Sequence, residues 1–182
     1  MNTSYLPLIT PRLSLRRLTP ADAEFIFELV NDPDWIRFIG DRGVRTLDDA
    51  QAYMSKGPMT MYEKHGFGLY LVEVRETGKP VGLSGLLKRD ALEDVDIGFA
   101  FLPSARGKGY AREAARAVIE EASTYHKLSR LVAITSLDNH SSIRLLESEG
   151  FRFERLLTMP GDSEPVKLFL REEAGGQPGV SQ

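Results

Sequence analysis

The chain has 182 residues, of which 42% are hydrophobic and 27% are charged, a composition typical of one globular domain and not of a disordered chain. The formal net charge of −3 at pH 7 argues against a nucleic-acid-binding protein, because that class usually carries a basic excess. The sequence contains no cysteine, which excludes disulfides, thiolate metal sites and a cysteine nucleophile.

The first half of the chain predicts one strand, several helices and a hairpin. Thr19 is placed to cap a helix, Pro20 suits its first position, and Asp22 stands where a capping-box acid is expected. The elements expected, in chain order, are a strand at 12–18, helices at 19–30, 34–40 and 46–65 with a break at Gly57-Pro58, and a hairpin of strands 68–74 and 80–87.

The second half predicts a strand–helix–strand unit. The elements expected are a strand at 95–102, a helix at 109–126, a strand at 130–136, a helix at 139–149, and two final strands at 151–158 and 166–171. A helix of this length between two strands indicates a parallel pair with a right-handed crossover. The order of elements therefore predicts an α/β protein with a mixed sheet.

The loop 106–111, Arg-Gly-Lys-Gly-Tyr-Ala, lies between a predicted strand and a predicted helix. Its glycines let a ligand approach the backbone, and the unpaired amides and dipole of the following helix favour a phosphate. The loop lacks the P-loop pattern, and Arg112 stands where a dinucleotide fingerprint needs its third small residue. A glycine-containing connection without a ligand is the structural alternative.

Several segments together resemble the GCN5-related N-acetyltransferase (GNAT) superfamily, especially its ribosomal-protein N-terminal acetylase branch. The resemblance extends over about residues 11–171. The matching segments are Arg106, Gly109 and Ala111 in the pattern [QR]-x-x-G-x-[GA], Asp96-Ile-Gly-Phe-Ala-Phe-Leu-Pro, Asn139-x-x-Ser142 followed by Leu145, Leu146 and Gly150-Phe151, Gly40-Asp41-Arg42, and Val81-Gly82.

This resemblance implies a single GNAT domain over residues 1–173, followed by a flexible C-terminal tail over residues 174–182. Within the domain it implies a mixed, mostly antiparallel sheet of about seven strands with about four flanking helices. The central parallel strands, 95–102 and 130–136, are expected to splay apart and form a V-shaped cleft.

The resemblance also implies that acetyl-CoA binds in this cleft. The pantetheine arm is expected along the strand backbone, the pyrophosphate on the amides of the glycine loop, and the thiol end beside the second helix. The implied cofactor-binding residues are Phe99, Ala100, Phe101, Arg106, Gly107, Lys108, Gly109, Tyr110, Ala111, Asn139 and Ser142.

The implied reaction is attack of a primary amine on the thioester. Asp96 is the candidate base, with Asp94 second because alternation puts it on the same strand face; both could equally be solvated surface acids. Leu146 stands where many relatives carry a catalytic tyrosine, so Ser142 is the candidate group for the leaving thiolate. Asn139 and Ser142 could also simply cap their helix.

The acceptor is expected to be a protein N-terminus or a small-molecule amine. The acidic residues Asp90, Glu93, Asp94, Asp96, Asp162 and Glu164 could attract a cationic amine or be ordinary surface charge, and Trp35, Phe38 and Tyr53 could line an acceptor pocket or belong to the core. The alternative function is a non-catalytic acyl-CoA-binding regulatory module, which the missing tyrosine favours.

Other classes of site and location are not expected. The three histidines do not pair at metal-ligand spacing, so no metal site is predicted. No secretory signal and no apolar run long enough for a membrane span are visible, which predicts a cytoplasmic protein without membrane partners. The resemblance leaves a homodimer open.

Overall fold

The computed structural model describes residues 5–174, so the predicted tail lies outside the described residues except for its first residue, Ala174. The strands are β1 (Leu8–Ile9), β2 (Leu13–Arg16), β3 (Leu69–Val74), β4 (Pro80–Leu87), β5 (Asp96–Phe101), β6 (Arg130–Ser136), β7 (Arg152–Leu157) and β8 (Val166–Glu172). The α-helices are α1 (Ala23–Val30), α2 (Pro33–Phe38), α3 (Leu47–Lys56), α4 (Pro58–His65), α5 (Tyr110–Thr124) and α6 (His140–Ser148).

All eight described strands form one sheet in the order β1-β2-β3-β4-β5-β6-β8-β7. Every neighbouring pair is antiparallel except β5 and β6, which are parallel in the centre. This confirms the predicted fold class and the predicted parallel pair. The structure describes eight strands and six α-helices, against expected counts of about seven and about four. The two-residue β1 is the additional strand, and the division at Gly57-Pro58 into α3 and α4 accounts for one of the additional helices.

The two central strands separate soon after they meet. Asp96 and Val132 form their one register pair, and the Val132 amide bonds to the Val95 carbonyl at 3.0 Å. By contrast, β5 pairs with β4 along its whole length and β6 does the same with β8. The parallel strands are therefore held by their outer neighbours while they diverge from each other, and one side of β5 is left without a partner strand.

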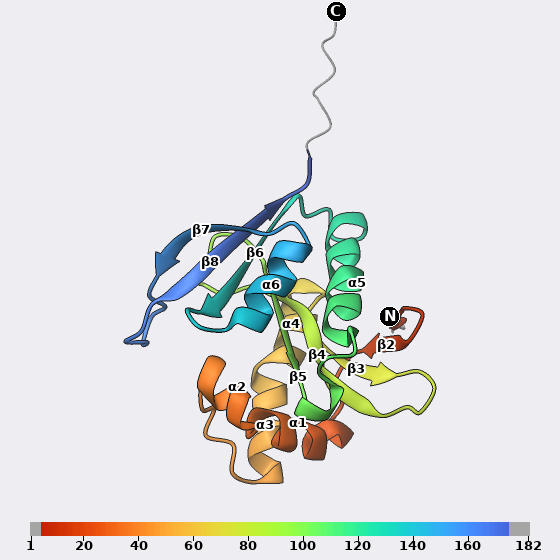
Figure 1. Ribbon diagram of the computed structural model, residues 1–182. Helices are drawn as coiled ribbons and strands as arrows, with labels where there is room; N and C mark the ends of the chain where they lie inside the picture. The colour runs from red at the N-terminus through yellow and green to blue at the C-terminus, as the bar shows by residue number, and fades with distance from the viewer. Residues whose placement is uncertain (1–4, 175–182) are drawn as a thin grey trace, which may run out of the picture.

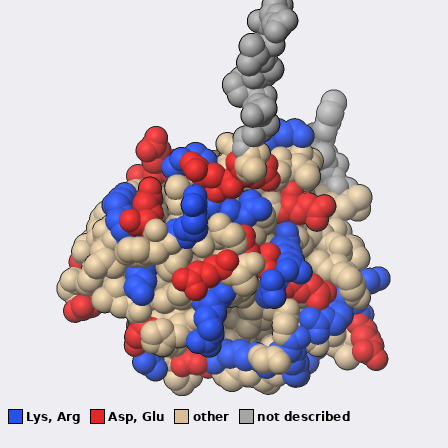
Figure 2. Space-filling view, turned by 45° about the horizontal axis from the view of Figure 1, so that its top comes forward, with Lys and Arg blue, Asp and Glu red and all other residues tan. Residues whose placement is uncertain are grey.

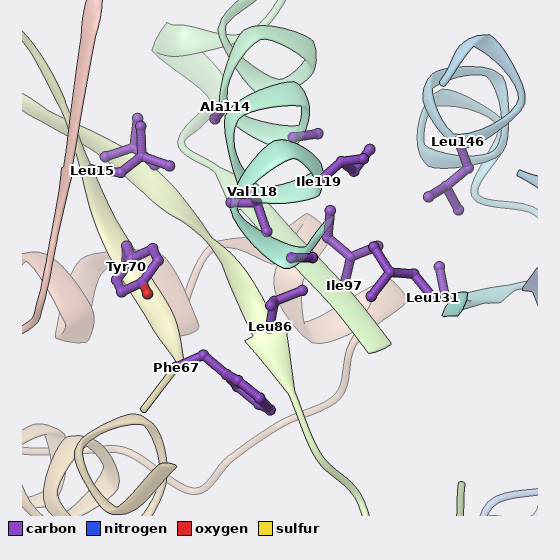
Figure 3. Packing of buried hydrophobic residues seen from close by; sticks show 14 of the residues in the cluster. Leu15, Phe67, Tyr70, Leu86, Ile97, Ala114, Val118, Ile119, Leu131 and Leu146 are labelled. Carbon is purple, nitrogen blue, oxygen red and sulfur yellow. The ribbon is translucent and has the colours of Figure 1, made fainter. Parts of the chain in front are cut away.

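Two clusters of hydrophobic side chains pack against the sheet, and Figure 1 shows α5 apart from α1, α2 and α3. On one face, α5 packs its small and branched residues Ala114, Val118 and Ile119 against sheet residues such as Leu86 and Ile97 (Figure 3). On the opposite face, α1 and α3 enclose a second cluster that includes Leu71 and Leu83. Helices on both faces bury the sheet and fix the directions in which the central strands diverge.

Candidate active site

A cavity of about 850 Å³ lies where β5 and β6 diverge. Its walls come from β5 and β6, from α6, from the start of α5, and from residues of α2, α3 and α4. The predicted site residues that line it are Asp96, Phe99, Ala100, Phe101, Arg106, Ala111, Asn139 and Ser142. Gly107, Lys108, Gly109 and Tyr110 are not part of its lining and continue from Arg106 into the start of α5. The divergence of the two strands thus brings most of the predicted residues to one space.

Asp96 lies at the point of divergence and is 1% exposed. Its Oδ2 accepts a hydrogen bond from Arg89 Nε at 3.1 Å, and its Oδ1 has no hydrogen-bond partner within the described part of the chain. Burial raises the pKa of Asp96 to about 6, although the cations of Arg89 and Lys88 act in the opposite direction. A carboxyl group with this pKa is a better proton acceptor at neutral pH than an ordinary aspartate.

The other predicted acids divide between the cavity and the surface. Asp94 pairs with Arg130 at 3.4 Å and does not line the cavity, although it precedes Asp96 by only two residues. Asp90 and Asp162 line the cavity and are exposed, whereas Glu93 and Glu164 are exposed and outside its lining. The two candidate bases therefore occupy different environments: Asp96 is buried at the cavity, and Asp94 belongs to a surface ion pair.

The glycine loop has the backbone that an anion site requires. Gly107 and Gly109 have φ angles of 74° and 81°, in the left-handed region that disfavours other residues. A Cβ atom on Gly109 would lie 3.2 Å from Arg12 Nη2. Gly109 is the N-cap of α5, and the first amides of that helix have no partner within the helix. A phosphate group fits this helix start in both charge and hydrogen bonding.

Arg106, one of the implied cofactor-binding residues, has its guanidinium bonded to other parts of the protein. Its guanidinium bonds the Phe101 carbonyl at 2.9 and 3.1 Å, pairs with Asp32 at 2.8 Å, and also pairs with Asp34. The side chain therefore connects the glycine loop to the start of α2. Its two carboxylate partners lie more than seventy residues away in sequence, so no local pattern could have revealed them.

Arg12 supports the loop from outside the motif. It donates to the Lys108 carbonyl at 2.8 Å, pairs with Glu113 at 2.7 Å, and lies over the Tyr110 ring at 4.7 Å. The side chains of Lys108 and Tyr110 thus flank a loop that is fixed through its backbone. Sequence analysis placed Arg12 in a strand and gave it no part in the loop.

The backbone of β5 faces the cleft at alternate residues. The Val95 carbonyl bonds β6 and the Leu102 amide bonds β4 through Val81, so odd-numbered residues of β5 direct their amide and carbonyl toward the cleft. Phe99 consequently offers both groups to a ligand. Ala100 directs its own toward β4, and the Phe101 carbonyl is already bonded by Arg106. Of the three predicted residues, Phe99 is the one best placed for backbone recognition.

Asn139 and Ser142 stand at the start of α6. Asn139 Oδ1 accepts a hydrogen bond from the Ser142 amide at 3.3 Å, so Asn139 caps the helix, as the structural alternative had it. Ser142 is half-buried and lines the cavity. Leu146 is 1% exposed within the main core, and its side chain offers no proton. Asn139, Ser141 and Ser142 are thus the polar residues that the start of α6 brings to the cavity, and of the two predicted ones Ser142 carries a hydroxyl group.

Comparison with known proteins identifies the fold. Residues 12–152 match the family model described as Acetyltransferase (GNAT) domain. The chain belongs to the GNAT acetyltransferase family. The uncharacterized N-acetyltransferase YnaD of Bacillus subtilis is 29% identical over 147 residues, which cover 81% of this chain and 83% of YnaD.

Solved structures of GNAT acetyltransferases have the same fold. An acetyltransferase of Agrobacterium tumefaciens strain C58 superposes with a TM-score of 0.79 at 24% identity, covering 95% of this chain and 98% of that chain. RimL, a ribosomal L7/L12 alpha-N-protein acetyltransferase in complex with coenzyme A, gives a TM-score of 0.78 at 16% identity, covering 91% and 97%. The predicted resemblance to the ribosomal N-terminal acetylase branch agrees with this similarity of fold.

The lining of the cavity also includes aromatic and cationic side chains from the helical segments. Trp35, Phe38 and Tyr53 line it, and Trp35 and Tyr53 also pack in the second hydrophobic cluster. Arg42 and Lys64 line it too, and neither had been predicted. Gly40-Asp41-Arg42 was recognised as a family segment, but nothing local in the sequence placed its arginine at a cavity.

Positive and negative side chains are mixed on the surface of this GNAT domain. The face seen in Figure 2 carries Lys and Arg side chains interspersed with Asp and Glu, with a hollow in its lower part. None of the helices within residues 5–174 combines the length and apolar character that a membrane span requires.

Proposed function

We propose that this GNAT-family protein transfers the acetyl group of acetyl-CoA to a primary amine, either a protein N-terminus or a small molecule. The observation that carries the proposal is the cavity between β5 and β6, which has the α5 helix start nearby and the buried carboxyl group of Asp96 at its apex. A site of this kind can hold two reactants side by side, and such orientation supplies a large part of a catalysed rate.

Acetyl-CoA supplies an activated acetyl thioester. The amides at the start of α5, in the segment from Gly107 to Ala111, suit its pyrophosphate, and the left-handed glycines keep Cβ atoms away from that group. The free backbone edge of β5 at Phe99 suits the pantetheine amides. Arg106 and Asn139 would act indirectly, by fixing the loop and by capping α6.

Asp96 would accept the proton that an ammonium group must lose before its nitrogen can attack the thioester. As the C–N bond forms and the C–S bond breaks, negative charge develops on the sulfur atom. Ser142 would donate a hydrogen bond to that sulfur, and the start of α6 would favour its charge. Each role uses a side chain that lines the same cavity.

A non-catalytic acyl-CoA-binding regulatory module is the second candidate. The observation that favours it is the buried Leu146 in the position where many family members carry a tyrosine. The two functions share the cofactor and differ in turnover. An acetyl-CoA-loaded protein that acetylates none of a broad panel of amines would favour the second candidate.

Acetyl-CoA is expected to stabilise the protein against heat. At a concentration of about one hundred times Kd, a ligand that binds only the folded state adds about 2.7 kcal/mol to the free energy of unfolding. For a domain of this size the midpoint should rise by about 5–10 °C. Differential scanning fluorimetry with acetyl-CoA, NAD and ATP measures this; a larger shift with NAD or ATP, or none with acetyl-CoA, would contradict the assigned cofactor.

Ser142→Ala is expected to lower kcat for amine acetylation by about tenfold to a hundredfold, because it removes a donor that acts on the developing thiolate. The Ser142 amide, which bonds Asn139, remains, so the cap of α6 and the thermal midpoint should be preserved. Ser148→Ala is the matched control, since Ser148 lies on the same helix, is exposed and bonds only a backbone carbonyl. Equal kcat for both variants would remove Ser142 from the mechanism.

A further inference from the structure

The wall of the cavity that comes from the helices and from the end of β4 contains several cations. Arg42 follows α2, Lys64 lies near the end of α4, and Lys88 and Arg89 follow β4; all four side chains line the cavity. The sequence left open whether the carboxylates around Asp96 attract a cationic amine or are ordinary surface charge. The acceptor that this wall can bind depends on which of its charged groups already have an ion-pair partner.

The more buried carboxylates of the cavity already have cationic partners. Asp32 and Asp34 both pair with Arg106, and Asp96 pairs with Arg89. Asp90 and Asp162 remain, and both are exposed to solvent. An acceptor with a second positive charge, such as a polyamine, would therefore find no buried carboxylate that is free to bind it.

Two of the cations, unlike these buried carboxylates, have no ion-pair partner among the described residues. Arg42 and Lys64 have no salt bridge within the part of the chain that the structure describes, and both are exposed at the cavity. Lys88, in contrast, donates its ammonium group to backbone carbonyls of its own loop, at Arg89 and Leu92. Arg42 and Lys64 are thus the cations of this wall that are available to a ligand.

Two aromatic side chains of the cavity, Tyr53 and Trp35, can also donate hydrogen bonds. Burial raises the pKa of the half-buried Tyr53 phenol, and Arg42 and Arg89 both lie close enough to oppose that effect. The phenol therefore stays neutral and can donate a hydrogen bond. Trp35 also lines the cavity, and its indole nitrogen, which can only donate, has no acceptor among the described residues. Tyr53 and Trp35 therefore add hydrogen-bond donors to the cations that line the cavity.

We propose that the acceptor is a small primary amine that also carries an anionic group, a carboxylate or a phosphate, and that Arg42 and Lys64 bind this group. The proposal rests on the acetyltransferase function proposed above, and it names the substrate class of that site. Arg42 can form a bidentate, charge-assisted pair with either anion, while Lys64 adds a second positive charge. Binding the anion at this wall leaves the amine free to reach Asp96.

The test compares amines that differ by one anionic group. Ethanolamine is paired with O-phosphoethanolamine, and cadaverine with L-lysine, which adds a carboxylate to the same carbon chain. Release of the coenzyme A thiol gives kcat/KM for each amine. At least one anionic member is expected to exceed its partner by about tenfold or more, as two charge-assisted hydrogen bonds would produce. The pair that shows the preference identifies carboxylate or phosphate as the anion.

Variants connect the preference to the residues. Arg42→Gln and Lys64→Gln should each reduce the ratio of kcat/KM between the anionic and the neutral or cationic partner toward one, mainly through KM. Arg152→Gln is the matched control, because Arg152 is exposed on β7 and does not line the cavity. A higher kcat/KM for ethanolamine and cadaverine, or ratios that Arg42→Gln and Lys64→Gln both leave unchanged, would overturn the proposal.

A binding measurement separates this proposal from the proposed function. Calorimetric titration of the same four amines into the protein saturated with coenzyme A should give the same order of affinities without any turnover. Equal affinities, or no binding of the anionic amines to the loaded protein, would overturn the anionic acceptor while leaving acetyl-CoA as the cofactor. If acetyl-CoA itself fails to stabilise the protein, the acetyltransferase function falls, and the acceptor proposal falls with it.

Discussion

Asp96→Asn is expected to lower kcat/KM for amine acetylation by about 10²- to 10⁴-fold, the usual contribution of a positioned general base. The variant keeps the shape of the side chain and removes its ability to accept a proton. Acetyl-CoA affinity should be unchanged, because the proposed contacts to the cofactor lie along β5 and at the start of α5. Steady-state kinetics and a thermal shift with acetyl-CoA measure the two properties separately.

The pH dependence of kcat/KM should contain a limb that comes from the ionisation of Asp96. Since burial raises the pKa of Asp96 to about 6, wild-type kcat/KM should fall as the pH drops through about 6 and Asp96 becomes protonated. The acceptor amine adds a separate limb above neutral pH, where it loses its own proton. Asp96→Asn should retain the amine limb and lose the limb near pH 6.

Stability should change in the opposite direction from activity. A carboxyl whose pKa is about 6 in the folded state and about 3.8 in the unfolded state binds more protons when folded, so stability falls as the pH rises from about 4 to about 6. Asp96→Asn has no carboxyl group at this position, so its stability should not fall for this reason as the pH rises. Relative to wild type, its free energy of unfolding should gain about 1–3 kcal/mol between pH 4 and pH 7, as urea unfolding at both pH values would show.

Asp94→Asn distinguishes the two carboxylates that the sequence left as alternatives. Asp94 pairs with Arg130 and lies outside the cavity lining, so its variant should keep wild-type kinetics and the limb near pH 6. Loss of activity in Asp94→Asn, or full activity in Asp96→Asn, would show that the role of base has been assigned to the wrong residue.

The sequence predicted the central unit of the fold well because its signals are local. The alternation around β5, the helical period of α5 and the β-branched run of β6 each lie within one segment, and the loop 106–111 marks the junction between the first two. Such patterns reflect burial and backbone preference, which act over a few residues. The strand β1 is only two residues long, too short for any period to be detected.

The site was predicted only where a motif marked it. Asp96 and Ser142 came from segments that match the family, and the structure brings both to the cavity. The partner of Asp96, Arg89, is seven residues away across the loop from β4 to β5, and the pair of Arg106 with Asp32 joins positions 74 residues apart. Contacts of this kind depend on how the elements pack together, so a linear pattern does not encode them.

The same reason explains why the sequence left the role of the acids near Asp96 open. Asp94 pairs with Arg130, which comes from another segment, and Asp96 pairs with Arg89. Arg42 and Lys64 reach the cavity from the loop after α2 and from α4, and the sequence had given neither residue a role in the site. The net charge of a site is a property of the assembled fold, whereas the sequence gives only the charges of its pieces.

Gly109→Asp is expected to raise the Kd for acetyl-CoA by at least about 100-fold while leaving the protein folded. The substitution places a carboxylate at the N-cap of α5, where the pyrophosphate is proposed to bind. Two like charges about 4 Å apart repel by about 4 kcal/mol at an effective dielectric constant of about 20. The carboxylate would also occupy the helix amides that the pyrophosphate needs.

Folding should tolerate this carboxylate. Aspartate is among the residues that best adopt the left-handed region, which Gly109 occupies with φ of 81°. A negative charge at the start of α5 is favourable for the helix, and the nearest group to the new Cβ is the guanidinium of Arg12, at 3.2 Å. Gly78→Asp controls for the backbone cost, because Gly78 has φ of 67° with open space around it in the turn after β3.

Gly109→Asn isolates the charge. Asparagine has almost the same size as aspartate and adopts the left-handed region as readily, so it tests the steric part of the effect. Its Kd for acetyl-CoA, measured by calorimetry, should lie much closer to wild type than that of Gly109→Asp. Equal weakening by both variants would mean that the loop excludes any side chain, whatever its charge. Normal affinity in a folded Gly109→Asp protein would mean that the pyrophosphate binds elsewhere, because no phosphate shares one helix start with a carboxylate at little cost.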